Sequence, residues 1–431
     1  MGFLQKFLPP EDRYAALLLY GMVFSTCFNG YDAGIMTVIL ADKQFIQYYS
    51  VDATRSGTIA AVPWASTGLA QLFVGGTLAN KVGRLWALRI SIASMIIGVI
   101  VQVVPNTYGV LILGRLITGL GFGCVYIASN LYVAECSPKL LRGSFVGTVA
   151  QFGYQLGTFI AFWTGYGMSF HTSPFNIAWR VSNVIQIPIG IAFIILSFWY
   201  PESPRWLLEK DNPDKALRVL CKLRMGTPQS EHVRAEFHEL VAARESRRRF
   251  DTGYAGLFKS AGLRKRLLYG LYATALQQAG GIAALTMYAT IVAMLFIVGL
   301  TYCWSNGPIT PAIASEIFPQ EVRDKAFGLS LLGQTVCLLA LTQPWPTFTS
   351  EVGGKSYWLL FGLNTLLLVS VIFILPETKG ISLERMDKIF GEVDAVEVGE
   401  EQGVDKVEAM VVSQLEHEEN ARHEGMELPR L

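Results

Sequence analysis

About ten long apolar segments divide this chain of 431 residues, and each is close to the length that crosses a lipid bilayer as a helix. Only 16% of the residues are charged, whereas soluble globular proteins average about 25%. We therefore expect an all-α integral membrane protein. Its spans are expected at roughly 14–40, 57–79, 85–104, 109–134, 144–166, 177–200, 267–289, 292–314, 326–347 and 357–375.

The distribution of basic residues predicts the orientation of these spans. Lys81 and Arg84 lie between the second and third spans, and the segment 201–266 is rich in Lys and Arg, whereas the loops 105–108 and 167–176 contain neither. Basic residues mark the cytoplasmic ends of spans. We therefore expect a multi-pass protein with both termini and the segment 201–266 in the cytoplasm.

A pair of sequence motifs occurs twice. The spacing E-x-x-P-x-x-x-R begins at Glu135 and again at Glu316. Each copy is followed by a second shared signal, PESPRWLLEK from Pro201 and PETKGISLER from Pro376. Internal repeats set between apolar spans are typical of secondary transporters.

The repeat divides the chain into four expected parts. Residues 1–200 form an N-terminal bundle of six helices, and residues 267–375 form a shorter bundle of about four. In the linker 201–266, apolar residues at helical spacing predict short amphipathic helices on the cytoplasmic face, with a membrane-surface role for its arginines as an alternative. The acidic tail 376–431 is expected to be partly disordered.

Seven motifs occur in the order of a known family. They are GGTLANKVGRLWAL, GRLITGLGFG, YVAECSPKLLRG, PESPRWLLEK, QQAGG, SEIFPQEVRDKA and PETKGISLE. Together they resemble the sugar porter family of the major facilitator superfamily, most closely its fungal hexose and quinate transporters, from about Phe28 to Arg385. The resemblance implies two pseudo-symmetric six-helix bundles around a central site.

The second half is shorter than the resemblance implies. It lacks the helices that the family numbers eight and nine, so about ten spans are expected instead of twelve. A splice form, an error in the gene model and a decayed gene copy remain open as explanations.

Two charged residues lie inside the spans. Asp32 is in FNGYDAGIM of the first span, and Arg115 begins the fourth in GRLITGLGFG. A carboxylate at this depth is costly, faces the bundle interior and commonly handles ions or protons. The resemblance assigns proton coupling to this pair. A static ion pair that joins the two spans is the alternative.

Several amides also lie within apolar helices. Gln151, Gln277 and Gln278 offer donors and an acceptor that suit sugar hydroxyls, although interhelical hydrogen bonds are common in membranes and are the alternative. The resemblance assigns these three residues to substrate contact. Thr158 and Gln334 are weaker matches to the family's binding positions.

The chain departs from the family pattern at three positions that affect the substrate. Ala283 replaces the usual asparagine after QQ-x-x-G-I, Pro311 replaces the tryptophan of GPxPW, and Thr335 stands where some members have another tryptophan. Because aromatic rings pack against the apolar faces of sugars, we expect the second half to bind hexose less well. The identity of the sugar stays open.

Charged residues at the cytoplasmic ends are expected to form a gate whose pairs break and re-form between states. Exposed pairs contribute about 0–1 kcal/mol each, and a network contributes more. Asn80 replaces the usual aspartate before Gly83 and Arg84, which leaves Arg84 one acidic partner short. Simple anchoring by basic residues is the alternative. The gate residues are Arg84, Glu135, Arg142, Glu202, Arg205, Glu316, Arg323 and Glu377.

Glycines recur at short spacing in the fourth span, at Gly114, Gly119, Gly121 and Gly123. We expect them to allow close helix packing.

Other classes of function have little support. The histidines are dispersed, no C-x-x-C pair is present, and a net charge of +1 argues against nucleic-acid binding. We expect no enzymatic activity, cofactor or metal, and partners limited to the bilayer, a proton and a small sugar or polyol. The sequence predicts proton-coupled transport of a monosaccharide, or a related polyol or cyclic acid, across a fungal plasma membrane. A transport-inactive remnant or a sugar-sensing membrane protein is the alternative.

Overall fold

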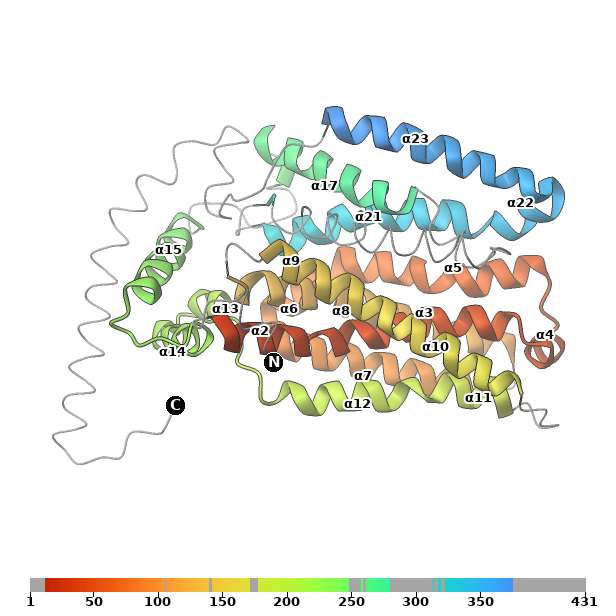
Figure 1. Cartoon of the computed structure of the whole chain (residues 1–431), viewed down its shortest axis with the longest axis horizontal. Helices are drawn as coiled ribbons and strands as arrows, with labels where there is room; N and C mark the ends of the chain where they lie inside the picture. The colour runs from red at the N-terminus through yellow and green to blue at the C-terminus, as the bar shows by residue number, and fades with distance from the viewer. Residues whose placement is uncertain are drawn as a thin grey trace.

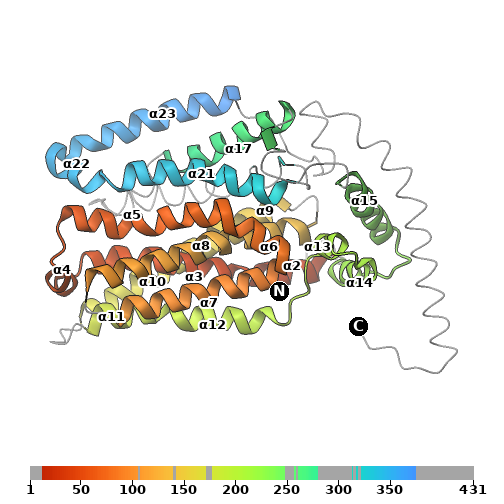
Figure 2. The same cartoon turned by 180° about the vertical axis from the view of Figure 1, so that it is seen from behind.

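The computed structural model describes residues 12–104, 107–138, 142–170, 177–247, 257–258, 261–279, 313, 317–318 and 322–374. Within these ranges the secondary structure is helical and contains no strand, which confirms the all-α prediction for this part of the chain. The long helices lie side by side along the longest axis of the molecule (Figures 1 and 2).

The first half contains six long helical segments, several of which are built from consecutive pieces. Two of the pieces, η2 and η4, are π-helical. In chain order the segments are α2 (Arg13–Gly21) with α3 (Val23–Leu40); α5 (Ala53–Leu69) with η2 (Ala70–Gly75) and α6 (Gly76–Val82); α7 (Arg84–Val103); α8 (Tyr108–Cys136); α9 (Arg142–Gly147) with η4 (Thr148–Phe152) and α10 (Gly153–Ser169); and α11 (Ile177–Val184) with α12 (Gln186–Ser197). The short α4 (Lys43–Tyr49) lies between α3 and α5.

The linker and the second half contribute seven further α-helices to the described residues, with the short 3-10 helix η5 (Gly353–Lys355) between the last two. They are α13 (Pro204–Glu209), α14 (Pro213–Leu223), α15 (Glu231–Arg247), α17 (Ala261–Ala279), α21 (Arg323–Thr342), α22 (Trp345–Val352) and α23 (Ser356–Ile374). The linker helices lie at one end of the bundle, and α4 and α22 lie at the other (Figure 1). The expected span 292–314 apart from residue 313, the last part of the span 267–289 and the tail 376–431 lie outside the described residues.

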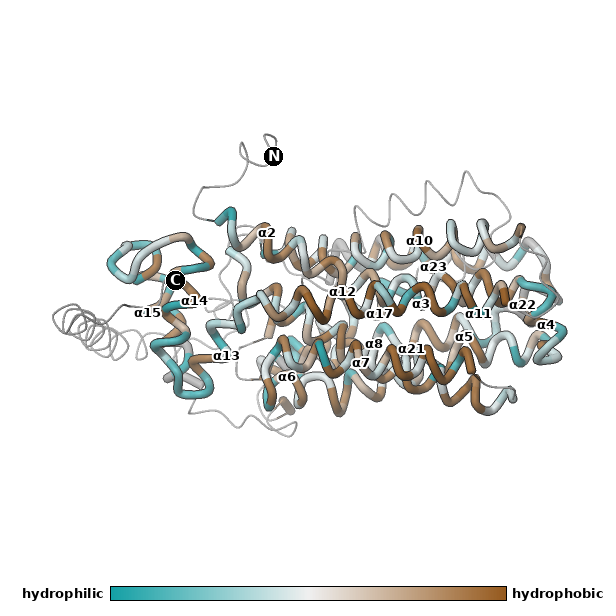
Figure 3. The backbone as a smooth tube through the Cα atoms, turned by 90° about the horizontal axis from the view of Figure 1, so that it is seen from below, coloured by the Kyte–Doolittle hydropathy of each residue, from teal (hydrophilic) through white to brown (hydrophobic). Residues whose placement is uncertain are grey.

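The surface of the bundle fits a membrane. Six helical segments in the described ranges are long and apolar enough to cross one: Arg13–Leu40, Ala53–Val82, Arg84–Val103, Tyr108–Cys136, Ile177–Ser197 and Lys325–Thr342. Hydrophobic residues run along the bundle, whereas the linker helices and α4 are more hydrophilic (Figure 3). Large side chains such as Ile97, Phe159 and Ile195 are more than half exposed on its sides. Lipid accounts for such a surface, since soluble proteins seldom expose large apolar patches.

Close packing of α8 uses the glycines of the fourth span. Gly114 and Gly121 face α7, whereas Gly119 and Gly123 face α5. A Cβ atom at Gly123 would lie 2.6 Å from the backbone oxygen of Thr67. The expected role of these glycines in helix packing is confirmed. They allow α8, which carries Arg115, to lie between two neighbouring helices.

A second close contact joins α3 to α10. A Cβ atom at Gly157 would lie 2.6 Å from the backbone nitrogen of Tyr31, and Gly30 lies directly against the backbone of Tyr154. Thr26 Oγ1 also donates a hydrogen bond to the backbone oxygen of Val149, at 2.5 Å. Asp32 lies on the other side of α3, which faces α5 and α8.

The two halves meet where α21 packs against α5 and η2. Thr335 of α21 lies against Gly68, where a Cβ atom would be 2.6 Å from its methyl group. Thr335 Oγ1 donates to the Gln71 side chain at 3.4 Å. A tryptophan at position 335 would not fit this approach, so the departure from the family pattern has a packing reason.

Candidate functional site

Asp32 and Arg115 form an ion pair inside the first half. The Nη1 atom of Arg115 lies 3.1 Å from Asp32 Oδ2 and 3.3 Å from Oδ1. Both side chains are buried, and Arg115 Nε has no hydrogen-bond partner among the described residues. At 3.1 Å and an effective dielectric constant of about 20, the Coulomb attraction is about 5 kcal/mol before the cost of desolvation. Arg115 therefore has a spare donor with which to meet a second acceptor.

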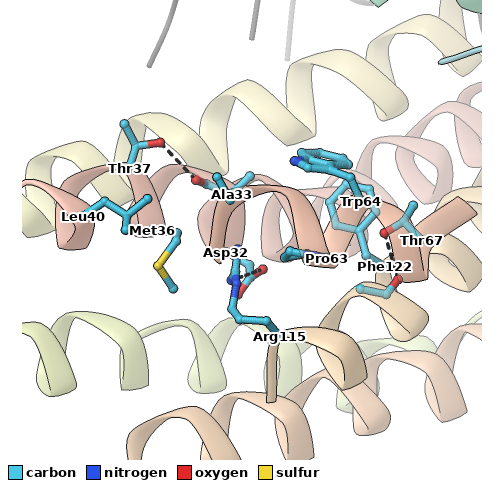
Figure 4. Close-up of a pocket in the computed structure, with 12 residues that line it drawn as sticks. Asp32, Ala33, Met36, Thr37, Leu40, Pro63, Trp64, Thr67, Arg115 and Phe122 are labelled. Atoms are coloured by element: carbon cyan, nitrogen blue, oxygen red, sulfur yellow. Dashed lines mark hydrogen bonds and ion pairs between the residues drawn. The ribbon is translucent and has the colours of Figure 1, made fainter. Parts of the chain in front are cut away.

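A small cavity lies beside this pair, between α3, α5 and α8. Figure 4 shows the Asp32 carboxylate facing Arg115, with Trp64 and Phe122 close to each other. The cavity of about 20 Å³ is large enough for one water molecule. Its polar lining is the ion pair with Thr37 and Thr67, and much of the remaining wall is apolar. A proton or water at Asp32 is thus enclosed by protein on several sides.

The wall includes aromatic residues that the sequence analysis did not single out. The rings of Trp64 and Phe122 are 5.2 Å apart at 74°, and those of Phe122 and Tyr154 are 6.4 Å apart at 78°. The Tyr154 hydroxyl is close enough to Asp32 to interact with it electrostatically. Only their tertiary neighbours distinguish these aromatics from the many others in the spans.

The five residues expected to contact substrate do not line this cavity. Gln151 and Gln278 are buried. The Gln334 side-chain oxygen is also buried and has no hydrogen-bond partner among the described residues. Gln277 is buried and has an interaction within the chain. The unpaired Gln334 oxygen argues against interhelical bonding as the reason for this residue, because a buried polar group without a partner is costly.

Thr158 behaves differently from these amides. Its hydroxyl oxygen lies 3.0 Å from the backbone oxygen of Gly30 and 3.1 Å from that of Tyr154. A hydroxyl has one proton to donate, and here it is directed to the α3–α10 contact. The geometry favours a packing role for Thr158 in this conformation.

Asn29 is a further buried amide that the sequence analysis missed. Both its Nδ2 and Oδ1 atoms are buried and have no hydrogen-bond partner among the described residues. Asn29 precedes Asp32 by three residues and Met36 by seven, so it shares their face of α3. Asp32 and Met36 both line the cavity. An asparagine after Phe28 in an apolar span was the available signal.

Two of the buried glutamines lie in π-helical turns. Gln71 is in η2 and Gln151 is in η4. Such turns occur mostly as single insertions in α-helices and are frequent at functional sites. No residue pattern in the sequence predicts these π-helical turns.

At the end of the bundle next to the linker helices, Arg84 and Glu135 form a buried pair. Arg84 Nη2 donates to Glu135 Oε1 at 2.8 Å, and Nε donates to Oε2 at 3.0 Å. Ser203 Oγ donates to the same carboxylate. The pair therefore joins the start of α7, the end of α8 and the start of the linker.

Glu202 holds the same region together through backbone groups. Its carboxylate accepts the N–H groups of Arg84 at 3.1 Å and Leu85 at 3.2 Å, which caps the N-terminus of α7. Gly83 has φ of +100°, and a Cβ atom there would lie 2.6 Å from Glu202 Oε2. Burial raises the pKa of Glu202 above its ordinary value, although the N–H donors and Arg84 oppose that shift.

The remaining gate residues are only partly covered by the structure. Arg142, Arg205 and Arg323 are buried, and Arg323 donates to the backbone oxygen of Phe318 at 2.9 Å. This burial favours a packed network over simple anchoring at the membrane surface. Glu316 and Glu377 lie outside the described residues.

Comparisons with known proteins agree on one family. The family model described as "Sugar (and other) transporter" matches residues 18–293 and 290–390. The MFS-type transporter criB of Aspergillus cristatus is 28% identical over 437 residues, covering 84% of this chain and 90% of that protein. The quinate permease of Emericella nidulans is 24% identical and covers 85% of this chain and 86% of its own.

Solved structures support the same fold. The proton:xylose symporter XylE bound to 6-bromo-6-deoxy-D-glucose superposes with a TM-score of 0.77 at 18% identity. The match covers 88% of this chain and 100% of that chain. The predicted major facilitator fold is confirmed by this likeness.

Proposed function

Because the chain belongs to the Sugar (and other) transporter family, we propose that it is a proton-coupled carrier of a monosaccharide, or of a related polyol or cyclic acid. It is a multi-pass membrane protein, and the proteins that resemble it are transporters rather than enzymes. The observation that carries the proposal is the buried Asp32–Arg115 pair beside a water-sized cavity. The named quinate permease and xylose symporter support a polyhydroxylated ring as substrate.

Proton coupling follows from the charge balance at the pair. When Asp32 is ionised, it attracts Arg115 and ties α3 to α8. When Asp32 takes up a proton, most of that attraction is lost, and the guanidinium turns to another acceptor. The unpartnered Nε of Arg115 supports this role. Protonation thereby loosens one wall of the first half and biases the carrier between its two open states.

Substrate contact is assigned to the buried amides. We place Gln151 and Asn29 of the first half, and Gln278 and Gln334 of the second, against substrate hydroxyl groups. The Asn29 side chain and the Gln334 side-chain oxygen have no hydrogen-bond partner among the described residues, and substrate hydroxyl groups would satisfy them. Gln151 and Gln278 are buried amides that can donate to and accept from the same hydroxyl groups. Gln277 joins them through its adjacent position, and Thr158 contributes only if its bond to Gly30 opens.

Alternating access requires the cytoplasmic ends to separate and close. We propose that the network of Arg84, Glu135, Glu202 and Ser203 keeps the inner end of the first half rigid while the halves rock. The halves are placed at 1–200 and 267–375, joined by the linker 201–266 and followed by the tail 376–431. We place both termini in the cytoplasm, because the linker is rich in basic residues. We propose the plasma membrane as the location, as for a carrier that takes up its substrate from outside the cell.

The test is uptake of labelled D-glucose and of labelled quinate into a transporter-null host, measured from pH 5 to 7. We expect wild-type uptake of one of them to rise as external pH falls. Asp32→Asn should abolish this pH dependence and accumulation against a gradient. Asp42→Asn, which changes an N-capping carboxylate outside the cavity, is the matched control and should keep both. Unchanged pH dependence in Asp32→Asn refutes proton coupling.

A transport-inactive remnant is the second candidate. The two matched segments of the family model meet at residues 290–293, where the second half is shorter than expected. Correct surface expression with no uptake of either compound, in wild type and control alike, would favour the remnant. An in-frame stretch of the gene at this point that encodes about 80 apolar residues would instead identify a shortened version of an ordinary transporter.

A further inference from the structure

Arg89 is a charged residue on the lipid-facing side of the first half. It lies five residues after Arg84, about 7.5 Å into α7 from the cytoplasmic end. Its neighbours Trp86 and Ile90 are about half exposed, which places them on the surface that lipid covers. A charge in this position is costly unless it reaches polar partners at the interface.

The protein satisfies only part of the Arg89 guanidinium. Nε donates to Ser197 Oγ at 2.8 Å, and Nη2 donates to the Ser197 backbone oxygen at 2.7 Å. The guanidinium carbon lies 4.8 Å from the ring centre of Trp86 and 4.3 Å from that of Phe198. The two hydrogen bonds occupy the Nε–Nη2 edge of the guanidinium, and the two aromatic rings contact the group as cation–π partners.

The other edge of the Arg89 guanidinium and its positive charge have no anionic partner among the described residues. Nη1 donates no hydrogen bond there, and no described carboxylate lies within 4.0 Å of the guanidinium. Glu202 acts on Arg89 electrostatically, but its oxygens accept the N–H groups at the start of α7. An anion from outside the protein is therefore the missing partner.

We propose that Arg89, Trp86 and Phe198 bind the phosphodiester of an inner-leaflet phospholipid, with a preference for anionic headgroups. Guanidinium groups match phosphate oxygens in geometry and charge, and tryptophan is enriched at membrane interfaces. Deeper in the membrane, exposed Ile90 and Ile195 offer an apolar surface on α7 and α12 for an acyl chain. The two helices pack side by side. Assignment to the inner leaflet rests on the proposed orientation; the binding site itself is independent of the transported substrate.

Such a lipid would connect α12 to the start of α7. Arg89 already contacts the last residue of α12, and Glu202, which caps α7, follows five residues later. A bound phosphodiester would neutralise Arg89 and hold the two helix ends together. The lipid would thus stabilise the cytoplasmic end of the first half.

The experiment uses the purified full chain and native mass spectrometry with titrated phosphatidylglycerol, phosphatidylcholine or inorganic phosphate. We expect wild type to retain phosphatidylglycerol more strongly than phosphatidylcholine. Arg89→Gln should weaken phosphatidylglycerol binding about fivefold. Lys81→Gln, which removes an exposed charge at the same end, is the control and should change it little. Ser197→Ala frees Nε of Arg89 but keeps the bond from Nη2 to the backbone oxygen, and it should bind phosphatidylglycerol at least as tightly as wild type.

Several outcomes would overturn the proposal. They are equal binding by Arg89→Gln and wild type, an equal loss in Lys81→Gln, and competition by inorganic phosphate that matches the lipid. If Arg89→Gln does not fold, Trp86→Ala replaces it, because it leaves the Ser197 contacts in place. Loss of the ring should weaken phosphatidylglycerol binding about threefold. Unchanged binding in Trp86→Ala would then refute the site.

Discussion

Replacing Glu135 by Gln tests whether the network of Arg84, Glu135, Glu202 and Ser203 holds the first half together. The substitution keeps the side-chain volume and one oxygen, but it removes the charge that Arg84 faces at 2.8 Å. It also places an amide N–H group near donors from Arg84 and Ser203, which are both buried. Arg84 would be left as a buried charge without its main partner.

The expected cost follows from burial and from the number of hydrogen bonds. Removing one member of a buried ion pair costs about 3–5 kcal/mol. Ser203→Ala removes the hydrogen bond to Glu135, which should cost about 1.5–3 kcal/mol. It also removes the N-cap of α13, where Ser203 Oγ accepts the Trp206 N–H, and this should add about 1 kcal/mol. Glu209→Gln is the matched control, because Glu209 lies 4.0 Å from Arg84 and is more exposed. Its cost should be about 1 kcal/mol or less.

Unfolding of the full chain in mixed detergent micelles, followed by tryptophan fluorescence, measures these differences. The pair Arg84→Gln and Glu135→Gln should be non-additive, with a coupling of about 0.5–3 kcal/mol in the double variant. Strictly additive costs, or equal costs for Glu135→Gln and Glu209→Gln, would refute the reasoning. In that case, the buried pair would not be what joins α7 to α8.

Three further predictions address the pH response, the packing and the substrate. Burial raises the pKa of Glu202, so its stabilising contribution is present below the ordinary value of 4.5 and is lost as pH rises through the raised pKa. Wild type should therefore lose stability relative to Glu202→Gln between pH 4 and 7 in thermal unfolding, and a relative gain would contradict this sign. Gly157→Ala should destabilise the chain by about 1–3 kcal/mol in micelle unfolding, because its Cβ atom would overlap the backbone of α3. The control Gly167→Ala, which has open space around it, should not; equal costs would exclude close packing as the cause. Asn29→Leu should raise the KM for labelled substrate about tenfold while surface expression is unchanged, and an unaltered KM would remove Asn29 from the substrate site.

Much of the fold could be predicted from local sequence patterns. Apolar runs of spanning length are visible without any tertiary information, because the bilayer sets the length of each helix. The same holds for Asp32 and Arg115, since charged residues stand out in apolar segments. Their pairing across 83 residues was expected, and the structure places them in contact.

Other features depended on which helices lie next to each other. Glu202 was expected as a charged gate residue, but it acts on the backbone of α7, and no side-chain pattern reveals such a partner. The sequence also does not predict that the Asn29 amide lacks a hydrogen-bond partner among the described residues, or that Gln151 lies in a π-helical turn. A hydrogen bond needs a partner at about 3 Å, and only the folded chain decides which groups meet at that distance. The sequence by itself thus determined that the chain crosses a membrane and where its buried charges lie. Tertiary packing decided which of its polar groups are satisfied and which are left to receive a ligand.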